Sequence, residues 1–136
     1  MANVVYWSQS GNTQAMAEAV AKGAGCQATF VSDASIDDLK AAKAFALGCP
    51  AMGAEVLEEG EMEPFVTDLE AFVSGKTIGL FGSYGWGDGQ WMRDWVERMQ
   101  AAGATVVNGE GIICQDAPSD DTLAECEALG KAIAAL

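Results

Sequence analysis

The sequence predicts an α/β protein, a three-layer doubly wound sandwich around a five-stranded parallel sheet with strand order 2-1-3-4-5. Short apolar runs alternate with amphipathic segments along the whole chain, as in a parallel sheet with crossover helices. The central run, residues 43–49, is apolar on both faces, which is typical of a strand buried between two helical layers. The right-handed crossover rule leaves few topologies, and we expect this order among them. The length favours a single domain over residues 1–136.

The first half of the chain is expected to supply three strands and two helices. The helix after the first strand carries Met16 and Val20 on one apolar stripe and ends near Gly25. Ser35, followed three residues later by Asp38, resembles a capping box that opens a short second helix. The strands are predicted at residues 4–7, 28–31 and 43–49.

The second half is expected to supply two strands and three helices. Pro64 suits the first position of a helix that buries Phe65, Leu69, Phe72 and Val73. The next helix buries two tryptophans and carries Asp94 and Arg98 as a surface ion pair. The predicted ranges are a strand at 77–81, a Gly-rich loop at 82–90, an interrupted fifth strand at 105–107 and 112–114, and a last helix at 119–136.

Charge and composition exclude several classes of function. The net charge is −13 with only seven basic residues, so nucleic acid and anionic membranes are not expected as partners, whereas a basic protein is. The absence of histidine excludes Ser-His-Asp and Cys-His catalysis and histidine metal sites. The four cysteines lack Cys-x-x-Cys spacing and are interpreted as packing residues, with no metal site expected. No signal sequence or membrane span is evident, which favours the cytoplasm.

Chemically unusual loops follow the first, third and fourth predicted strands. In the strand order 2-1-3-4-5 the carboxyl ends of these three strands border the crevice in which such sheets bind ligands. The loops span residues 8–13, 50–63 and 82–90. We therefore expect one ligand site built from all three.

The first loop has the composition of a phosphate cradle. It offers hydroxyl and amide donors at the start of a helix, where free backbone N–H groups and a partial positive charge favour anions. It lacks the lysine of the nucleotide-binding P-loop, which indicates one terminal phosphate rather than a polyphosphate. A Ser- or Asn-capped helix with no ligand is the simple alternative. The residues are Ser8, Gln9, Ser10, Gly11, Asn12 and Thr13.

The three loops together resemble those of the flavodoxin family. Ser8–Thr13 is similar to the flavodoxin phosphate loop, Thr/Ser-x-Thr/Ser-Gly-Asn-Thr. Residues 49–53 and 82–89 look like the two loops that grip the flavin in short-chain members such as the clostridial and Megasphaera-type flavodoxins. Residues 105–114 leave little room for the insertion of the long-chain subgroup. The resemblance covers the chain in the expected order, and it implies noncovalently bound FMN.

The resemblance assigns roles to the first loop and to the acidic segment of the second. Side chains of Ser8, Ser10, Asn12 and Thr13 would donate to the phosphate, Gly11 would let the backbone approach, and Gln9 would contribute only its backbone. Glu55 would accept the hydrogen bond of flavin N3–H. The acidic run that includes Glu55 would disfavour the anionic hydroquinone and attract basic partners, although a solvated face is the simple alternative.

The resemblance also places the flavin ring. Trp86 lies between glycines, where helical core packing cannot explain it, and would stack on the ring; an aromatic folded onto the surface is the alternative. Met52 would cover the other face, and Tyr84 would lie near the ribityl chain. The Gly53 peptide would turn over at the first reduction, since glycine visits both conformations cheaply. The remaining expected contacts are Pro50, Ala51, Ala54, Ser83, Gly85, Gly87, Asp88 and Gly89.

Two positions depart from the family pattern. Pro50 stands where some short-chain members have a serine that reaches the phosphate, so that donor is absent here. Ala54 stands where an aspartate or serine can occur, so a side chain that could bias the turning of the Gly53 peptide is missing. We expect FMN to bind nonetheless.

The function implied is that of a low-potential one-electron carrier without catalytic residues. It would cycle between the semiquinone and hydroquinone of FMN, as a monomer, and exchange electrons with larger oxidoreductases in place of ferredoxin. A flavin enzyme such as a small quinone reductase is the alternative, although Trp86 would block its substrate face. A receiver domain is rejected because Trp7-Ser8 and Cys49-Pro50 stand where it needs acidic residues. A dinucleotide-binding domain lacks its Gly-x-Gly-x-x-Gly.

Overall fold

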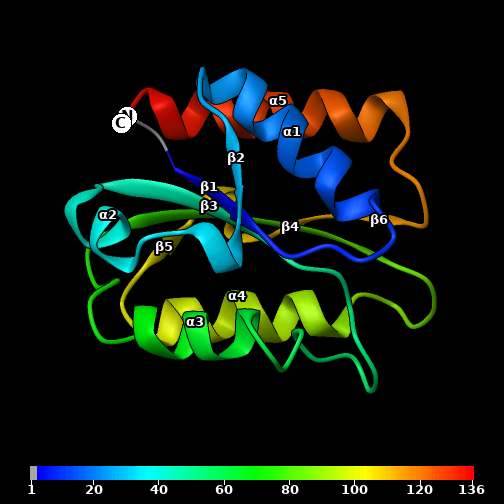
Figure 1. Cartoon of the computed structure of the whole chain (residues 1–136), viewed down its shortest axis with the longest axis horizontal. Coiled ribbons are helices and arrows are strands. Elements are labelled where there is room, and N and C mark those ends of the chain that lie inside the picture. Colours follow the sequence, from blue (N-terminus) through cyan, green and yellow to red (C-terminus); the bar gives the residue numbers. More distant parts are fainter. Residues whose placement is uncertain (1–2) are drawn as a thin grey trace.

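The computed structural model describes residues 3–136 and alternates strands with helices along the chain (Figure 1). The strands are β1 (Val4–Tyr6), β2 (Ala28–Phe30), β3 (Ala44–Gly48), β4 (Thr77–Tyr84), β5 (Thr105–Val106) and β6 (Ile112–Gln115). The α-helices are α1 (Asn12–Ala24), α2 (Ile36–Ala41), α3 (Met62–Leu69), α4 (Gln90–Ala101) and α5 (Asp120–Ala134). Two short 3₁₀ turns are η1 (Val31–Asp33) and η2 (Val107–Gly109).

The sheet is parallel, and its order β2-β1-β3-β4-β5 confirms the prediction. Strand β6 also pairs with β4, so β5 and β6 share the fifth position and η2 interrupts them. The interrupted fifth strand was therefore predicted correctly. Helices α1 and α5 cover one face of the sheet and α3 and α4 cover the other (Figure 1).

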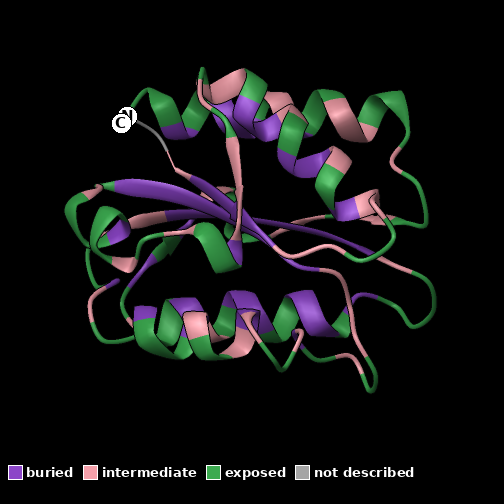
Figure 2. Ribbon diagram, viewed as in Figure 1, coloured by how far each residue is buried: buried purple, intermediate pink, exposed green. Residues whose placement is uncertain are grey.

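The core lies on both sides of β3 and β4, which are buried along most of their length (Figure 2). On the side of α3 and α4, the largest buried side chains are Phe45, Trp91 and Trp95. On the side of α1 and α5, Met16 and Phe81 fill the space. This double burial explains why the third predicted strand is apolar on both faces.

Helices α1 and α5 approach each other closely through glycines. A Cβ atom at Gly130 would clash with the backbone carbonyl of Val20, and one at Gly23 would clash with that of Glu127. Glycine is therefore required on each helix for this contact. The contact packs the C-terminal half of α1 against α5.

Strand β4 is longer than expected. It runs to Tyr84 because its last four residues pair with β6, and this places Ser83 and Tyr84 in the strand rather than in the following loop. The pairing is long-range, so the composition of the Gly-rich segment does not reveal it. Ser83 is consequently held by the sheet.

Three local predictions about helices were wrong. Helix α3 begins at Met62, so Pro64 is its third residue, and it ends at Leu69. Ser35 is the N-cap of α2, but its side chain makes no capping hydrogen bond, so the capping box does not form. Arg98 pairs with carboxylates of the neighbouring helix instead of Asp94, whose Oδ1 accepts from the Gln90 side chain.

The four cysteines are free, and two of them, Cys49 and Cys126, are buried. Burial raises the pKa of both thiols to about 12. Both residues belong to the apolar clusters described above. This agrees with the interpretation of the cysteines as packing residues.

Candidate functional site

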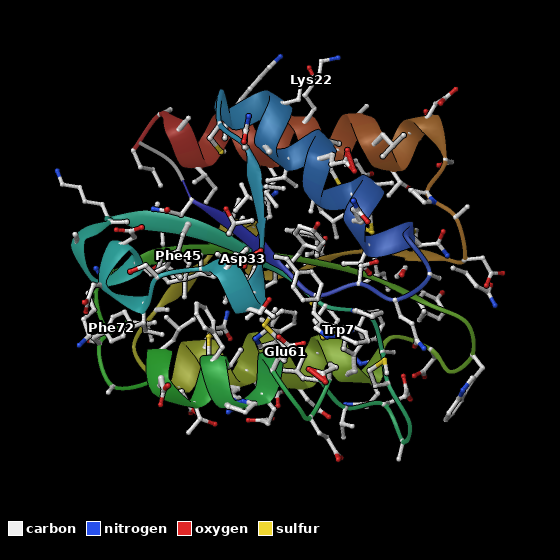
Figure 3. All side chains as sticks on the ribbon, viewed as in Figure 1. Trp7, Lys22, Asp33, Phe45, Glu61 and Phe72 are labelled. Carbon is white, nitrogen blue, oxygen red and sulfur yellow. The ribbon has the colours of Figure 1, made fainter. Side chains whose placement is uncertain are left out.

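The loops that follow β1, β3 and β4 lie together at the carboxyl edge of the sheet, at the right of Figure 1, away from the C-terminus. The three loops therefore meet at the edge where the strand order predicted that they would. Trp7, which directly follows β1, lies between the sheet and the layer of α3 and α4, where it packs against the core cluster (Figure 3).

The first loop is shaped by its own hydroxyl groups. The N–H of Gly11 donates to Ser8 Oγ at 3.2 Å, and the N–H of Asn12 donates to Ser10 Oγ at 3.4 Å. Gly11 is the N-cap of α1 with φ 96°, a left-handed conformation that favours glycine. Gln9 and Ser10 are exposed, whereas Thr13 is buried.

The start of α1 is free for an anion. The first turn contains no acidic residue, although the chain has twenty, and the N-cap residue, Gly11, has no side chain that could cap the helix; only the N–H of Asn12 is taken, by Ser10 Oγ. The first backbone N–H groups of a helix have no partner within the helix. Together with the serine hydroxyls, they form a set of neutral donors of the kind that binds a phosphate group.

The second loop contains a tight turn. Met52 and Val56 exchange two backbone hydrogen bonds, of 2.9 and 3.0 Å, and so close the segment between them. Gly53 in this turn has φ 47°, and Glu55 also has a positive φ, of 57°. Gly53 and Ala54 are exposed, while Met52 is half-buried.

Glu58 holds the end of the second loop against α3. Its carboxylate accepts hydrogen bonds from the N–H groups of Gly60, Glu61 and Met62, which lie just before and at the start of α3. Burial acts to raise the pKa of Glu58, but these three donors outweigh it and lower the pKa below its ordinary value. Glu58 is therefore a helix cap rather than only part of a solvated acidic face.

The third loop runs from Gly85 to Gly89 and is almost wholly exposed. Trp86 keeps 65% of its surface exposed and is the most exposed large apolar residue of the described chain. Gly87 and Gly89 have φ values of 89° and 92°. The guanidinium of Arg93 donates to the backbone carbonyl and the carboxylate of Asp88, both at 3.0 Å, and so fastens the loop to α4.

Ser83 joins all three loops. Its backbone carbonyl accepts from the N–H of Ala51 at 3.0 Å, which ties it to the second loop. Its backbone N–H donates to Thr13 Oγ1 at 3.3 Å, and the two hydroxyl oxygens lie 2.9 Å apart. Because Ser83 precedes the third loop, this one residue connects the first loop with both others.

Glu55 forms a second connection, between the second and third loops. Its Oε1 accepts from the N–H of Gln90 at 3.0 Å, at the first residue of α4. Its carboxylate also lies against Gly87, where a Cβ atom would come within 2.7 Å of Oε1. The sequence did not indicate this contact, because Glu55 and Gln90 are 35 residues apart.

Trp91 also supports the candidate site, a role that its position in the sequence did not predict. Its indole Nε1 donates to the carbonyl of Cys49 at 3.1 Å, where the chain leaves β3. Its ring lies 5.6 Å from that of Tyr84, centroid to centroid. Helical spacing predicted Trp91 as a core residue, and it is one, but nothing local shows where a buried indole N–H will find its acceptor.

Comparison with known proteins decides the family. The flavodoxin family model matches residues 4–130. The chain belongs to the flavodoxin family. A flavodoxin of Clostridium beijerinckii is 48% identical over 136 residues, which cover 96% of this chain and 97% of the relative. A flavodoxin of Megasphaera elsdenii is 48% identical over 139 residues, 98% of each chain.

The structural comparison agrees. The solution structure of two-electron reduced Megasphaera elsdenii flavodoxin matches with a TM-score of 0.81 and 45% identity, covering 100% of both chains. Flavodoxins are low-potential electron carriers that bind FMN, and this chain is one of them rather than an enzyme. The length of 136 residues is that of the short-chain type.

The residues of this flavodoxin fit FMN. The donor set at the start of α1 suits a phosphate, and one hydroxyl proton of the buried Thr13 and Ser83 pair has no acceptor among the described residues. Val56 in the second loop and Trp86 in the third are large apolar side chains that are exposed, as suits residues that a flat ring covers. In the described part of the chain, no cluster of acidic, cysteine or histidine residues suits a metal ion.

None of the helices between residues 3 and 136 combines the length and the apolar character needed to cross a membrane.

Proposed function

We propose that this flavodoxin holds FMN in the three loops described above, as a monomeric one-electron carrier that serves larger oxidoreductases in place of ferredoxin. The observation that carries the site assignment is the junction at Ser83, which joins the loops after β1, β3 and β4. When bound, FMN supplies a ring that accepts and returns one electron at a time. The protein positions that ring and adjusts its surroundings.

The first loop is proposed to bind the phosphate. Ser8 and Ser10 already accept from backbone N–H groups, and their own hydroxyl protons can still donate outward. Asn12 adds its side chain, because its backbone N–H already donates to Ser10 Oγ, and Thr13 adds its side chain and its backbone N–H. All these donors are neutral, so the phosphate charge is left uncompensated, which disfavours further negative charge nearby.

The second and third loops are proposed to hold the ring between Met52 and Trp86, with Tyr84 beside the ribityl chain. The exposure of Trp86 leaves its ring free to stack, and Met52 can adapt to a flat surface. The remaining contacts proposed are with Gln9, Gly11, Pro50, Ala51, Gly53, Ala54, Glu55, Ser83, Gly85, Gly87, Asp88 and Gly89. For Glu55, Oε1 is used by Gln90, which leaves Oε2 to accept the flavin N3–H.

Gly53 is proposed to turn its peptide between redox states. Its φ of 47° favours glycine, and a Cβ atom at this position would meet no other atom within 4 Å. The turn is therefore limited by backbone conformation rather than by packing. Ala54 provides no hydrogen-bonding side chain that could favour one orientation of the peptide.

Basic redox proteins are the partners that we infer for this surface. Carboxylates of Glu59, Asp88 and Asp116 are exposed near the loops, and the chain as a whole carries a net charge of −13. The negative electrostatic potential of these charges attracts basic protein surfaces, and it repels a second copy of the chain and anionic polymers. We infer that residues 1–136 form one domain. We also infer that the protein works in the cytoplasm, where its four free cysteines stay reduced.

Ligand titration tests the proposal. Apoprotein titrated with FMN should bind one equivalent tightly and quench the fluorescence of the flavin. FAD should bind more weakly, because the loops offer no donor to its second phosphate. Anaerobic titration of the loaded protein should show two separate one-electron steps, the second at low potential. Apoprotein that takes up no FMN would refute the site, and a single two-electron step would refute the carrier role.

A further inference from the structure

Thr13 and Ser83 form a buried hydroxyl pair at the base of the phosphate loop. Their side chains belong to residues that are 1% and 4% exposed, and they are the two buried polar residues of the described chain. The hydroxyl oxygens lie 2.9 Å apart, and the Ser83 N–H also donates to Thr13 Oγ1 at 3.3 Å. The pair therefore has two hydroxyl protons for one mutual hydrogen bond.

The direction of that bond follows from the available acceptors. Among the described residues, Ser83 Oγ has one hydrogen-bond partner, the Thr13 hydroxyl. If Thr13 donated, the Ser83 proton would be left without an acceptor within the sheet, which costs free energy. If Ser83 donates, Thr13 Oγ1 accepts two hydrogen bonds, which fills its two lone pairs. The proton of Thr13 must then turn away from Ser83.

The free proton of Thr13 lies at the second residue of α1. There it stands beside the backbone N–H groups of the first turn, which have no partner within the helix. No acidic side chain of that turn competes for it. The hydroxyl therefore adds one directed donor to the anion-binding end of the helix.

We propose that Ser83 is a positioning residue that directs the Thr13 hydroxyl proton toward the phosphate of FMN. The inference rests on the proposed function and deepens it, because it makes a residue at the end of β4 a determinant of phosphate affinity. Ser83 acts through Thr13, so the effects of removing the two hydroxyls are not independent. A purely structural pair would lower the stability of the fold without any preference for phosphate.

The test compares three ligands on apoprotein variants: FMN, riboflavin, which lacks the phosphate, and inorganic phosphate. Dissociation constants are measured by calorimetry for Thr13→Val, Ser83→Ala and the double variant. Thr13→Val should weaken FMN binding about tenfold or more, as for loss of a hydrogen bond to a charged group. Ser83→Ala should weaken it by a few-fold, since the Thr13 hydroxyl remains but loses its orientation.

Non-additivity is the decisive result. The double variant should bind FMN no more weakly than Thr13→Val alone, because Ser83 has nothing to direct once the Thr13 hydroxyl is gone. Inorganic phosphate should follow the same order, and riboflavin affinity should stay within twofold of the wild type. Additive losses for FMN, or an equal loss for riboflavin, would overturn the role of Ser83.

Two controls keep the outcomes distinct. Thr122→Val removes one hydroxyl of the similar but exposed pair of Ser119 and Thr122, 3.1 Å apart at the start of α5, and should leave all three affinities unchanged. If Ser83→Ala does not fold, Ser83→Cys, a weaker donor, replaces it, and unchanged FMN affinity would overturn the proposal. A wild-type apoprotein that binds neither FMN nor riboflavin would instead overturn the proposed function.

Discussion

Glu55 illustrates how a single side chain can join two loops that are distant in sequence. Its carboxylate accepts from the first N–H of α4, where the helix carries a partial positive charge. To do so, the residue takes a positive φ, which is uncommon for a residue other than glycine. The contact with Gln90 therefore compensates for some backbone strain in the second loop.

Replacing this carboxylate should weaken the apoprotein. Glu55→Gln removes the negative charge from the start of α4, and we expect the free energy of unfolding to fall by about 0.5–1 kcal/mol. Urea unfolding of the apoprotein measures it. Glu59→Gln, at an exposed carboxylate of the same loop, is the matched control and should change the stability less. Equal losses in the two variants would show that Glu55 does not act as a cap.

Gly53 should tolerate only residues that accept a left-handed backbone. At φ 47°, Gly53→Val should cost about 1–2 kcal/mol of apoprotein stability, whereas Gly53→Asn should cost less, since asparagine adopts this conformation more readily. Unfolding by urea provides the comparison. In the loaded protein, the valine variant should also bring the two one-electron potentials closer together. Two well-separated potentials in that variant would exclude a turning peptide.

At the scale of elements, α3 and α4 are held together by one arginine. Arg98 on α4 makes two hydrogen bonds to the Glu63 carboxylate, of 2.8 and 2.6 Å, and two to Glu70, of 3.1 and 2.8 Å. The Glu63 carboxylate accepts from Arg98, and this lowers its pKa below the ordinary value, as does a hydrogen bond from Thr67. The ion pair links the helix after the second loop to the helix after the third.

Removing this link should alter stability in a pH-dependent way. The folded-state pKa of Glu63 is lowered, so its contribution is complete above the unfolded value of 4.5 and is lost as the pH falls through the folded pKa. Arg98→Met should therefore cost about 1 kcal/mol near neutral pH, and less as the pH drops below about 4.5. Chemical unfolding across this pH range measures the difference.

Arg93→Met is the control for Arg98→Met, because it also removes an arginine from α4. Arg93 pairs with Asp88 at 3.0 Å, but both side chains are more than half exposed, so solvent screens the pair. Its replacement should cost less stability than that of Arg98. A cost for Arg98→Met that stayed constant below pH 4.5 would contradict the assignment to Glu63.

At the scale of the whole molecule, charge is distributed unevenly. The five lysines, at positions 22, 40, 43, 76 and 131, all lie outside the three loops of the site, and Lys22 projects from the outer side of α1 (Figure 3). Lys76 is occupied by the carbonyls of Lys40 and Ala42 at the end of α2. The site itself is thus left with its carboxylates and with Arg93, which is paired with Asp88.

Self-repulsion at a net charge of −13 should make stability depend on salt. Raising KCl from about 10 to about 150 mM shortens the Debye length from about 30 to about 8 Å and screens that repulsion. We expect the apoprotein Tm to rise by roughly 2–5 °C near neutral pH. Differential scanning calorimetry measures it, with sucrose at matched osmolality as control. A falling Tm would show that attractive pairs such as that of Arg98 dominate.

Much of the architecture was predictable because it depends on local pattern. The alternation of apolar runs and amphipathic segments predicted the layers and the strand order, and the spacing of Trp91 and Trp95 predicted the buried face of α4. Predictions that concerned a single partner failed. Arg98 had a carboxylate four residues away in sequence, but it pairs with Glu63 in α3 and with Glu70 directly after α3.

Residue type and short-range spacing were enough to predict the type of fold, and they place neutral donors in the first loop and chemically unusual residues in the other two. How the three loops connect could not be predicted in the same way. The contacts of Ser83 with Thr13 and of Glu55 with Gln90 join residues 70 and 35 positions apart. Such contacts depend on how strands and helices pack, and neither partner's neighbours along the chain encode where the other will lie.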